Sequence, residues 1–127
     1  MSVHTDKIGG VLIVECEGSM AGADAAARLR DAVTSENGAR IIVIDLSKVD
    51  YVAGDGLAML AFLQRWAHEN VVQLKLFNPS RFVRHVLKQA GSMFQFDFAS
   101  LKETMALLAR ADSELRLGKD SQFQHSA

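Results

Sequence analysis

The sequence contains a single cysteine, Cys16, and no long apolar stretch. One cysteine cannot form an internal disulfide bond, and its position in an apolar run indicates a buried structural thiol rather than a reactive one. No stretch approaches the roughly 20 apolar residues that cross a bilayer, and residues 1–10 lack a signal-peptide pattern. We therefore expect a cytoplasmic protein with no direct membrane insertion.

The sequence also lacks an excess of charge of either sign. Its 14 Lys and Arg residues stand against 15 Asp and Glu residues, which gives a net charge of −1. Without a basic surplus, the composition does not indicate nucleic acid as a partner. The chain has 127 residues, of which 49% are hydrophobic and 23% charged, so it fits a single globular domain with one core.

The motifs of common enzyme and metal sites are missing. No lysine follows the glycines at positions 54 and 56, and Asp55 stands where a phosphate-binding loop would hold its anion. There is no G-x-S-x-G motif, and the four histidines are scattered singly, so we expect no metal and no cofactor. Asp45 and Asp50 are more typical of turn or solvent-facing positions than of an acid–base pair. We therefore expect a protein that is not an enzyme.

Apolar runs alternate with helix-forming runs along the chain. Branched apolar residues fill positions 41–46, which predicts a strand buried on both faces. Before the Gly9-Gly10 turn we expect a short strand at best. Ser80 is placed to cap a helix, and Ser100 and Glu103 have capping-box spacing. The remaining strands are predicted at 11–17, 71–77 and 93–98, and the helices at 23–33, 56–66, 81–90 and 101–115.

This alternation of strands and helices predicts an α/β domain. The short first connection predicts one antiparallel pairing in a mixed, mostly parallel sheet of about four to five strands, accompanied by about four helices. We assign the domain to residues 1–116. Residues 117–127 are polar and lack periodicity, so we expect them to form a flexible tail.

Two stretches of the sequence resemble the STAS domain family, which includes bacterial anti-sigma factor antagonists and the cytoplasmic tails of sulfate transporters. In the first, family members commonly read D-L-S and then D-S-S-G-L, and this chain reads Asp45-Leu46-Ser47 and then Tyr51-Val52-Ala53-Gly54-Asp55-Gly56-Leu57. The second is similar to the family's N-x-S, V-x-x-V-L and T-G-L pattern, and it reads Asn78-Pro79-Ser80, Val83-Arg84-His85-Val86-Leu87 and Ala90-Gly91. The resemblance covers about residues 11–108.

The resemblance implies a non-enzymatic switch protein that binds an anti-sigma factor kinase or a related switch protein. In anti-sigma factor antagonists, phosphorylation of the second serine of D-S-S-G ends that interaction. Asp55 replaces this serine here, so we expect no serine phosphorylation at the usual position. We expect docking through the loop and helix at 53–66, with these docking residues: Ala53, Gly54, Gly56, Leu57 and Met59.

Two interpretations of Asp55 stay open at this point. Its carboxylate could cap the helix that we expect to begin at Gly56, by accepting backbone N–H bonds at the positive end of the helix dipole. It could also hold a permanent negative charge where relatives place a phosphate, although a carboxylate carries less charge than a phosphoserine. The two roles can coexist.

Two other functions also stay open. Some STAS relatives bind small molecules, so the chain could be a sensor or carrier of a nucleotide or lipid, with Arg81, Arg84 and Lys88 binding the anion; the alternative for these residues is a solvated helix face. The chain could instead be a scaffold subunit or homodimer, with the aromatic segment Phe94, Phe96 and Phe98 covered by a neighbour; the alternative is an edge strand covered within a monomer.

Overall fold

The computed structural model describes residues 1–35, 38–90 and 96–125, with residues 114–125 as helix backbone only. Its elements alternate as the sequence predicts. In chain order they are β1 (Ser2–Ile8), β2 (Val11–Met20), α1 (Ala23–Thr34), β3 (Ile41–Val52), α2 (Gly54–Glu69), β4 (Gln73–Phe77), α3 (Arg81–Ala90), β5 (Phe98–Ala99) and α4 (Leu101–His125).

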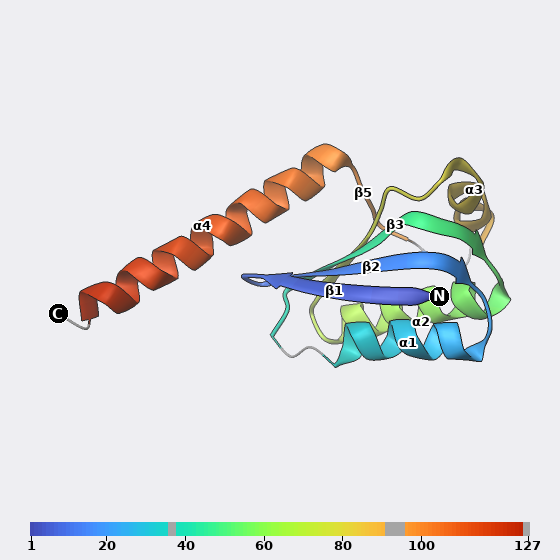
Figure 1. Ribbon diagram of the computed structural model, residues 1–127, viewed down its shortest axis with the longest axis horizontal. Coiled ribbons are helices and arrows are strands. Elements are labelled where there is room, and N and C mark those ends of the chain that lie inside the picture. The colour runs from blue at the N-terminus through green and yellow to red at the C-terminus, as the bar shows by residue number, and fades with distance from the viewer. Residues whose placement is uncertain (36–37, 91–95, 126–127) are drawn as a thin grey trace.

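The strands form one five-stranded sheet in the order β1-β2-β3-β4-β5 (Figure 1). β1 pairs with β2 in the antiparallel direction across the Gly9-Gly10 turn, and the other neighbours are parallel. This arrangement confirms the predicted mixed, mostly parallel sheet in an α/β domain. None of the described helices is both long and apolar enough to cross a bilayer.

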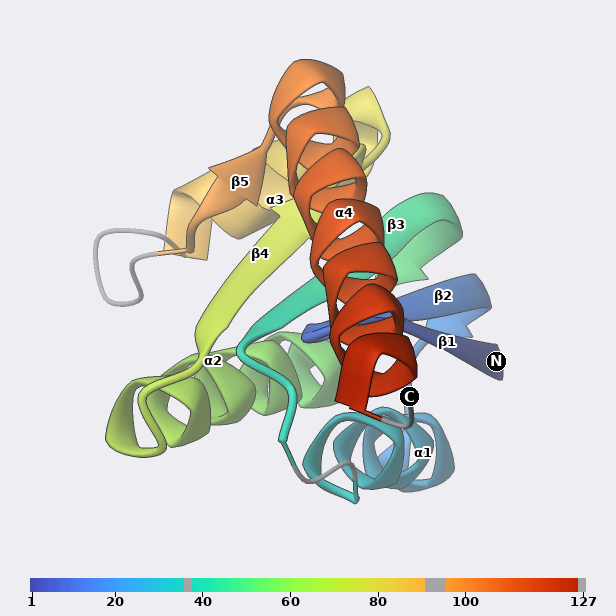
Figure 2. The same ribbon diagram turned by 90° about the vertical axis from the view of Figure 1, so that its left-hand side faces the viewer.

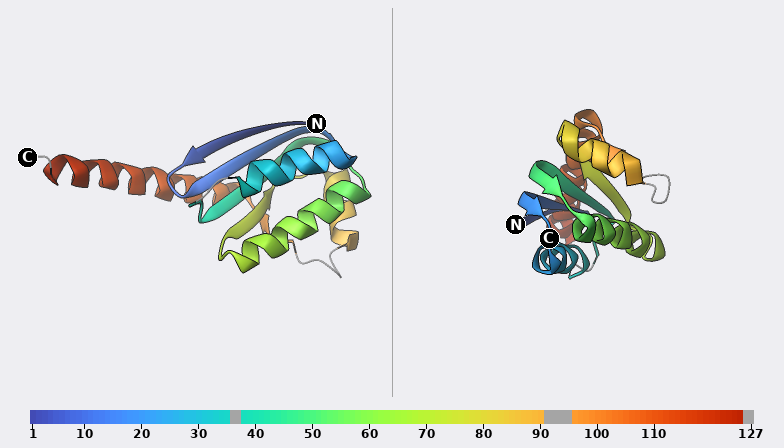
Figure 3. Two further views of the ribbon diagram at one scale, coloured as in Figure 1. Left: turned by 90° about the horizontal axis from the view of Figure 1, so that it is seen from below. Right: turned by 90° about the vertical axis from the view of Figure 1, so that its right-hand side faces the viewer.

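The two faces of the sheet carry separate apolar clusters. On one face, Leu12 and Ile42 pack with Leu29 of α1, Leu63 of α2 and Leu87 of α3, and all five are fully buried. Figures 1 and 3 show α1 and α2 side by side along this face. The other face holds a smaller cluster, to which α4 contributes: Val11, Val43 and Ala111. Beyond this contact α4 extends away from the sheet (Figure 1), and in Figure 2 it lies in front of the strands.

β3 is longer than predicted, and its far half matters for the site. It continues past Leu46 to Val52 because it stays paired with β2, whose register shifts at two points, between Glu15 and Glu17 and at Gly18. Gly18 lies inside β2 with φ +102° where the pairing register shifts, so β2 continues past its predicted end at residue 17 to Met20. β4 pairs only with the first half of β3, from Ile41 to Asp45. Asp45 and Asp50 are therefore strand residues and not turn residues.

Other predicted boundaries shift by a few residues. β1 is a full strand, β4 begins at Gln73, and α2 begins at Gly54 and not at Gly56. The predicted edge strand at 93–98 corresponds to β5, although residues 93–95, including Phe94, lie outside the described residues. α4 continues past Leu115 to His125, and flexibility of residues 117–127 stays a prediction.

Both predicted serine caps are present. The hydroxyl of Ser80 accepts a hydrogen bond from the backbone N–H of Val83 at 3.2 Å, at the start of α3. The hydroxyl of Ser100 accepts one from the N–H of Glu103 at 3.1 Å, at the start of α4. The Glu103 carboxylate accepts a hydrogen bond from the Ser100 hydroxyl at 3.3 Å. The capping signals in the sequence therefore locate the first turn of both helices.

Because β2, β3 and β4 are parallel, the chain enters α1, α2 and α3 at a common edge of the sheet, which we call the carboxyl edge. The Gly9-Gly10 turn, Arg40 and Val71 lie at the opposite edge, which we call the amino edge. α2 runs from the first edge to the second. Surface features at the two edges are therefore separated by the length of this helix.

Candidate functional site

The connection from β3 to α2 lies at the carboxyl edge. Ala53 is the N-cap of α2, with φ −90° and ψ 177°. Its N–H donates to the carbonyl oxygen of Met20 at 3.0 Å, and its own carbonyl accepts from the N–H of Leu57 at 2.9 Å. The last residue of β2 thus holds the first turn of α2 against the sheet.

Gly56 is buried where α2 begins. A Cβ at this position would stand 2.6 Å from Met20 Cγ and would also collide with the Met20 carbonyl oxygen. Only a residue without a side chain allows the helix to approach β2 so closely. Gly56 was predicted as a docking residue, but its burial gives it a role in positioning the exposed residues around it.

Asp55 is exposed in the first turn of α2. Of the two interpretations left open by the sequence, Asp55 as the N-cap does not hold, because the helix begins at Gly54 and Ala53 occupies the N-cap. Among the described residues, the Asp55 carboxylate has no hydrogen-bond or ion-pair partner. Its negative charge lies near the positive end of the helix dipole, which is a favourable position for a carboxylate.

The exposed face of α2 continues from Asp55 toward the helix centre. Ala58, Phe62 and Arg65 follow at helical spacing and are all exposed, and 48% of Phe62 is accessible to solvent. By contrast, Leu57 and Met59, which were predicted to dock a partner, are half-buried and pack against the core. The helix thus presents the charged residues Asp55 and Arg65 and the aromatic ring of Phe62 to solvent.

A pair of exposed aromatic rings lies at the same edge. Tyr51, near the end of β3, stacks with Phe82, in the first turn of α3, with ring centroids 6.5 Å apart and an angle of 19° between the planes. Phe82 is 56% exposed and Tyr51 is 47% exposed. The pair forms because β3 extends beyond β4 and α3 packs over that extension. Sequence reasoning missed it, since the two residues are far apart in the chain.

A family model described as the STAS domain matches residues 2–107. The chain belongs to the STAS domain family. BtrV of Bordetella bronchiseptica, which carries the name of an anti-sigma factor antagonist, is 28% identical to it over 107 residues, covering 84% of this chain and 92% of BtrV.

Solved structures share the fold of this STAS domain at low sequence identity. Unphosphorylated SpoIIAA, an anti-sigma factor antagonist from Bacillus, has a TM-score of 0.65 and 14% identity, over 84% of this chain and 94% of SpoIIAA. A serine-to-glutamate variant of RsbS from Moorella thermoacetica has a TM-score of 0.65 and 19% identity, over 87% of this chain and 97% of RsbS. These similarities establish the STAS fold for the chain.

The basic residues of α3 do not converge on a cavity in this STAS domain. Arg81, Arg84 and Lys88 are exposed along the helix. The guanidinium carbon of Arg84 lies 5.4 Å from the centroid of the Phe98 ring, a cation–π contact. A small cavity of about 260 Å³ beside Arg84 is not lined by the other two residues. Anion binding by these residues stays a prediction.

Three further side chains singled out from the sequence, Asp45, Asp50 and Cys16, are hydrogen-bonded or buried. Asp45 accepts a hydrogen bond from the N–H of Ser47 at 2.9 Å, and Asp50 accepts one from the Ser19 hydroxyl at 3.1 Å. Cys16 is 2% exposed, and burial raises the pKa of its thiol to about 12. The described residues contain no cluster of three or more metal-ligating side chains.

Proposed function

We propose that this STAS domain is a non-enzymatic regulatory module that docks a protein partner at the carboxyl edge of its sheet. The proposed docking surface consists of four exposed residues of α2 together with the stacked aromatic pair: Gly54, Asp55, Ala58, Phe62, Tyr51 and Phe82. Burial of exposed aromatic rings of this kind by a partner stabilises the complex, and aromatic residues are enriched among interface hot spots.

The observation that carries the proposal is the exposed Asp55 carboxylate, which has no described partner and begins the exposed face of α2. It occupies the position that resembles the phosphorylated serine of anti-sigma factor antagonists. SpoIIAA has been solved in both unphosphorylated and phosphorylated forms. A carboxylate at this position cannot be switched by a serine kinase, so the local charge is permanent.

The partner that fits this position is an anti-sigma factor kinase or a related switch protein, in a bacterial cytoplasmic pathway that regulates transcription. The similarity to BtrV, named as an anti-sigma factor antagonist, supports this class of partner. In this proposal the partner packs against the aromatic rings and contacts the negatively charged carboxylate of Asp55. Binding is then set by partner availability, without phosphorylation at residue 55.

The test uses purified anti-sigma factor kinases encoded in the same genome and measures their binding to the wild type, Asp55→Ser and Asp55→Ala by calorimetry. We expect Asp55→Ala to bind at least about tenfold more weakly than the wild type, because it loses a charge-assisted contact. Asp24→Ala is the matched control, because Asp24 lies in the first turn of α1 and carries the same charge. Equal affinities for all four proteins would contradict a role of Asp55 in docking.

The same kinases with ATP test whether docking is gated. We expect mass spectrometry to find no phosphate on the wild type and a phosphate on residue 55 of Asp55→Ser. Phosphorylation of the wild type at Ser47 that alters binding would contradict a module whose binding is independent of phosphorylation.

For the aromatic part of the docking surface, Phe62→Ala should weaken binding about tenfold. Met105→Ala, which removes an exposed apolar side chain of α4 outside the docking surface, should not.

A further inference from the structure

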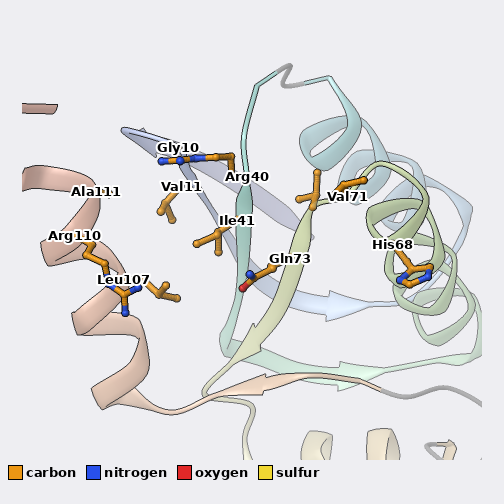
Figure 4. A pocket seen from close by; sticks show the side chains of 11 residues that line it. Gly10, Val11, Arg40, Ile41, His68, Val71, Gln73, Leu107, Arg110 and Ala111 are labelled. Atoms are coloured by element: carbon orange, nitrogen blue, oxygen red, sulfur yellow. The ribbon is translucent and has the colours of Figure 1, made fainter. Parts of the chain in front are cut away.

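A cavity opens at the amino edge of the sheet, at the end of α2 opposite to Asp55. It has a volume of about 690 Å³ and lies between α4 and the first residues of β2, β3 and β4 (Figure 4). Small-molecule sites typically measure about 300 to 1,000 Å³. The cavity is thus large enough for a small ligand, and none of the predicted site residues lines it.

The inner wall of the cavity is apolar. Val11 and Ala111 are each 3% exposed, and Ile41 and Leu107 are half-buried. Ile41 comes from β3 and Leu107 from α4, and Figure 4 shows their side chains in the space between these two elements. An apolar group of a ligand would therefore be covered from two sides.

Two arginines line the cavity from different elements. The Arg40 side chain lies over Gly10, where a Cβ would stand only 2.7 Å from Arg40 Nε, and the Arg40 N–H donates to the Gly10 carbonyl at 2.8 Å. Arg110 comes from α4 and has no ion-pair partner among the described residues. None of the described residues that line the cavity is acidic. The local charge therefore favours an anion.

The rim of the cavity carries a strained valine. Val71 follows the C-cap of α2, where the N–H of Val72 donates to the Ala67 carbonyl at 2.8 Å and the N–H of Val71 donates to the His68 carbonyl at 3.3 Å. This Schellman motif needs one residue in the left-handed conformation, which is usually a glycine. Here Val71 adopts that conformation, with φ +55°. The Val71 side chain is nevertheless 91% exposed. A branched side chain in this conformation adds strain, and it gains burial only when something covers it.

We propose that this cavity binds a small amphipathic anion, with its carboxylate or phosphate at Arg40 and Arg110 and its apolar body against Ile41, Leu107 and Val71. The proposal does not depend on the docking function, because it uses the opposite edge of the sheet. It also differs from the predicted anion site on α3, which shares none of these residues.

Decanoate is a suitable probe because it combines a carboxylate with an apolar chain. We expect it to bind the full-length protein by calorimetry and to raise the thermal midpoint, since a ligand of the native state stabilises that state. Acetate lacks the apolar chain and 1-decanol lacks the charge, so neither should reproduce the effect at the same concentration. Binding to phosphatidylglycerol vesicles without binding to monomeric decanoate would overturn the proposal of a small-molecule site.

Matched variants test the two parts of the site. Arg110→Gln should weaken decanoate binding about fivefold through loss of a charged contact. Lys102→Gln, which removes an exposed cation from the same helix outside the cavity, should leave it unchanged. If Arg110→Gln and Lys102→Gln behave alike, or if Arg84→Gln abolishes binding, the proposed site is wrong.

Val71→Gly gives a readout that a purely structural role would not produce. The substitution should raise the thermal midpoint, because glycine accepts the left-handed conformation, and should weaken decanoate binding about threefold to tenfold through lost apolar contact. Asn78→Gly is the control, since Asn78 also has a positive φ of +51° but lies outside this cavity. It should leave decanoate binding unchanged. A Val71→Gly protein that binds decanoate as well as the wild type overturns the role of the valine.

Discussion

Gly56 lies so close to Met20 that a Cβ on residue 56 would stand 2.6 Å from Met20 Cγ. We expect Gly56→Ala to lower the free energy of unfolding by about 1 to 2 kcal/mol, because the overpacking cost exceeds the gain in helix propensity. Chemical denaturation measures this change. Gly54→Ala is the control, since a Cβ there meets no atom within 4 Å. If both variants have the same stability, the close approach does not constrain the helix.

At the C-terminal end of α2, we expect a substitution to stabilise the protein. Val71→Gly should raise the free energy of unfolding by about 0.5 to 1 kcal/mol, because relief of the left-handed strain outweighs the added entropy of the unfolded chain. Val71→Ala removes the β-branch but keeps the unfavourable conformation, so it should gain less. Denaturation curves for the three proteins check this order, and a destabilised Val71→Gly variant would contradict it.

Ser80 tests the cap at the start of α3. Ser80→Ala removes the oxygen that accepts the Val83 N–H, so we expect a loss of about 1 kcal/mol in the free energy of unfolding. Ser80→Asp keeps an acceptor at the same place and should retain most of the stability. Thermal and urea denaturation compare the variants, and equal stability of the alanine and aspartate forms would show that the cap contributes nothing.

Cys16 predicts a dependence of stability on alkaline pH. Burial, with a smaller contribution from the charge of Asp45, raises the pKa of its thiol from 9.0 to about 12. The neutral thiol is therefore favoured in the folded state, and this contribution is present below pH 9 and lost as the pH rises toward 12. Between about pH 9 and pH 11, the wild type should lose stability more steeply than Cys16→Ala, by up to about 1.4 kcal/mol per pH unit. Parallel slopes for the two proteins in urea denaturation would refute this.

Local signals in the sequence predicted much of the fold. The branched apolar run that begins at Ile41 is a strand, the helix that begins at Ala23 has nearly the predicted bounds, and Ser80 and Ser100 cap their helices. The sequence signal for each of these features lies within a few residues of the chain. They could therefore be inferred without knowledge of the tertiary structure.

Features that depend on distant contacts were missed. In the far half of β3, Leu46, Val49 and Val52 are buried at intervals of three residues because the pairing with β2 shifts register, and no simple strand alternation describes this pattern. α2 begins at Gly54 although glycine is a poor helix former, because Met20 holds the preceding residue in place. The motif around Asp55 was visible in the sequence, but the position of the N-cap at Ala53 was not.

The cavity at the amino edge could not be predicted for the same reason. Its lining comes from four separate parts of the chain, represented by Gly10, Arg40, Val71 and Leu107. None of these residues belongs to a sequence motif that indicates a ligand site. Only the packing of α4 beside the first residues of the strands brings them together.

α2 begins next to the proposed docking surface and ends at the rim of the cavity. Its 16 residues span about 24 Å at the rise of an α-helix. Substitutions this far apart normally have additive effects on free energy. The effects of Asp55→Ala and Val71→Gly on stability should therefore sum in the double variant. A departure from that sum would show that the two edges of the sheet communicate through the body of this helix.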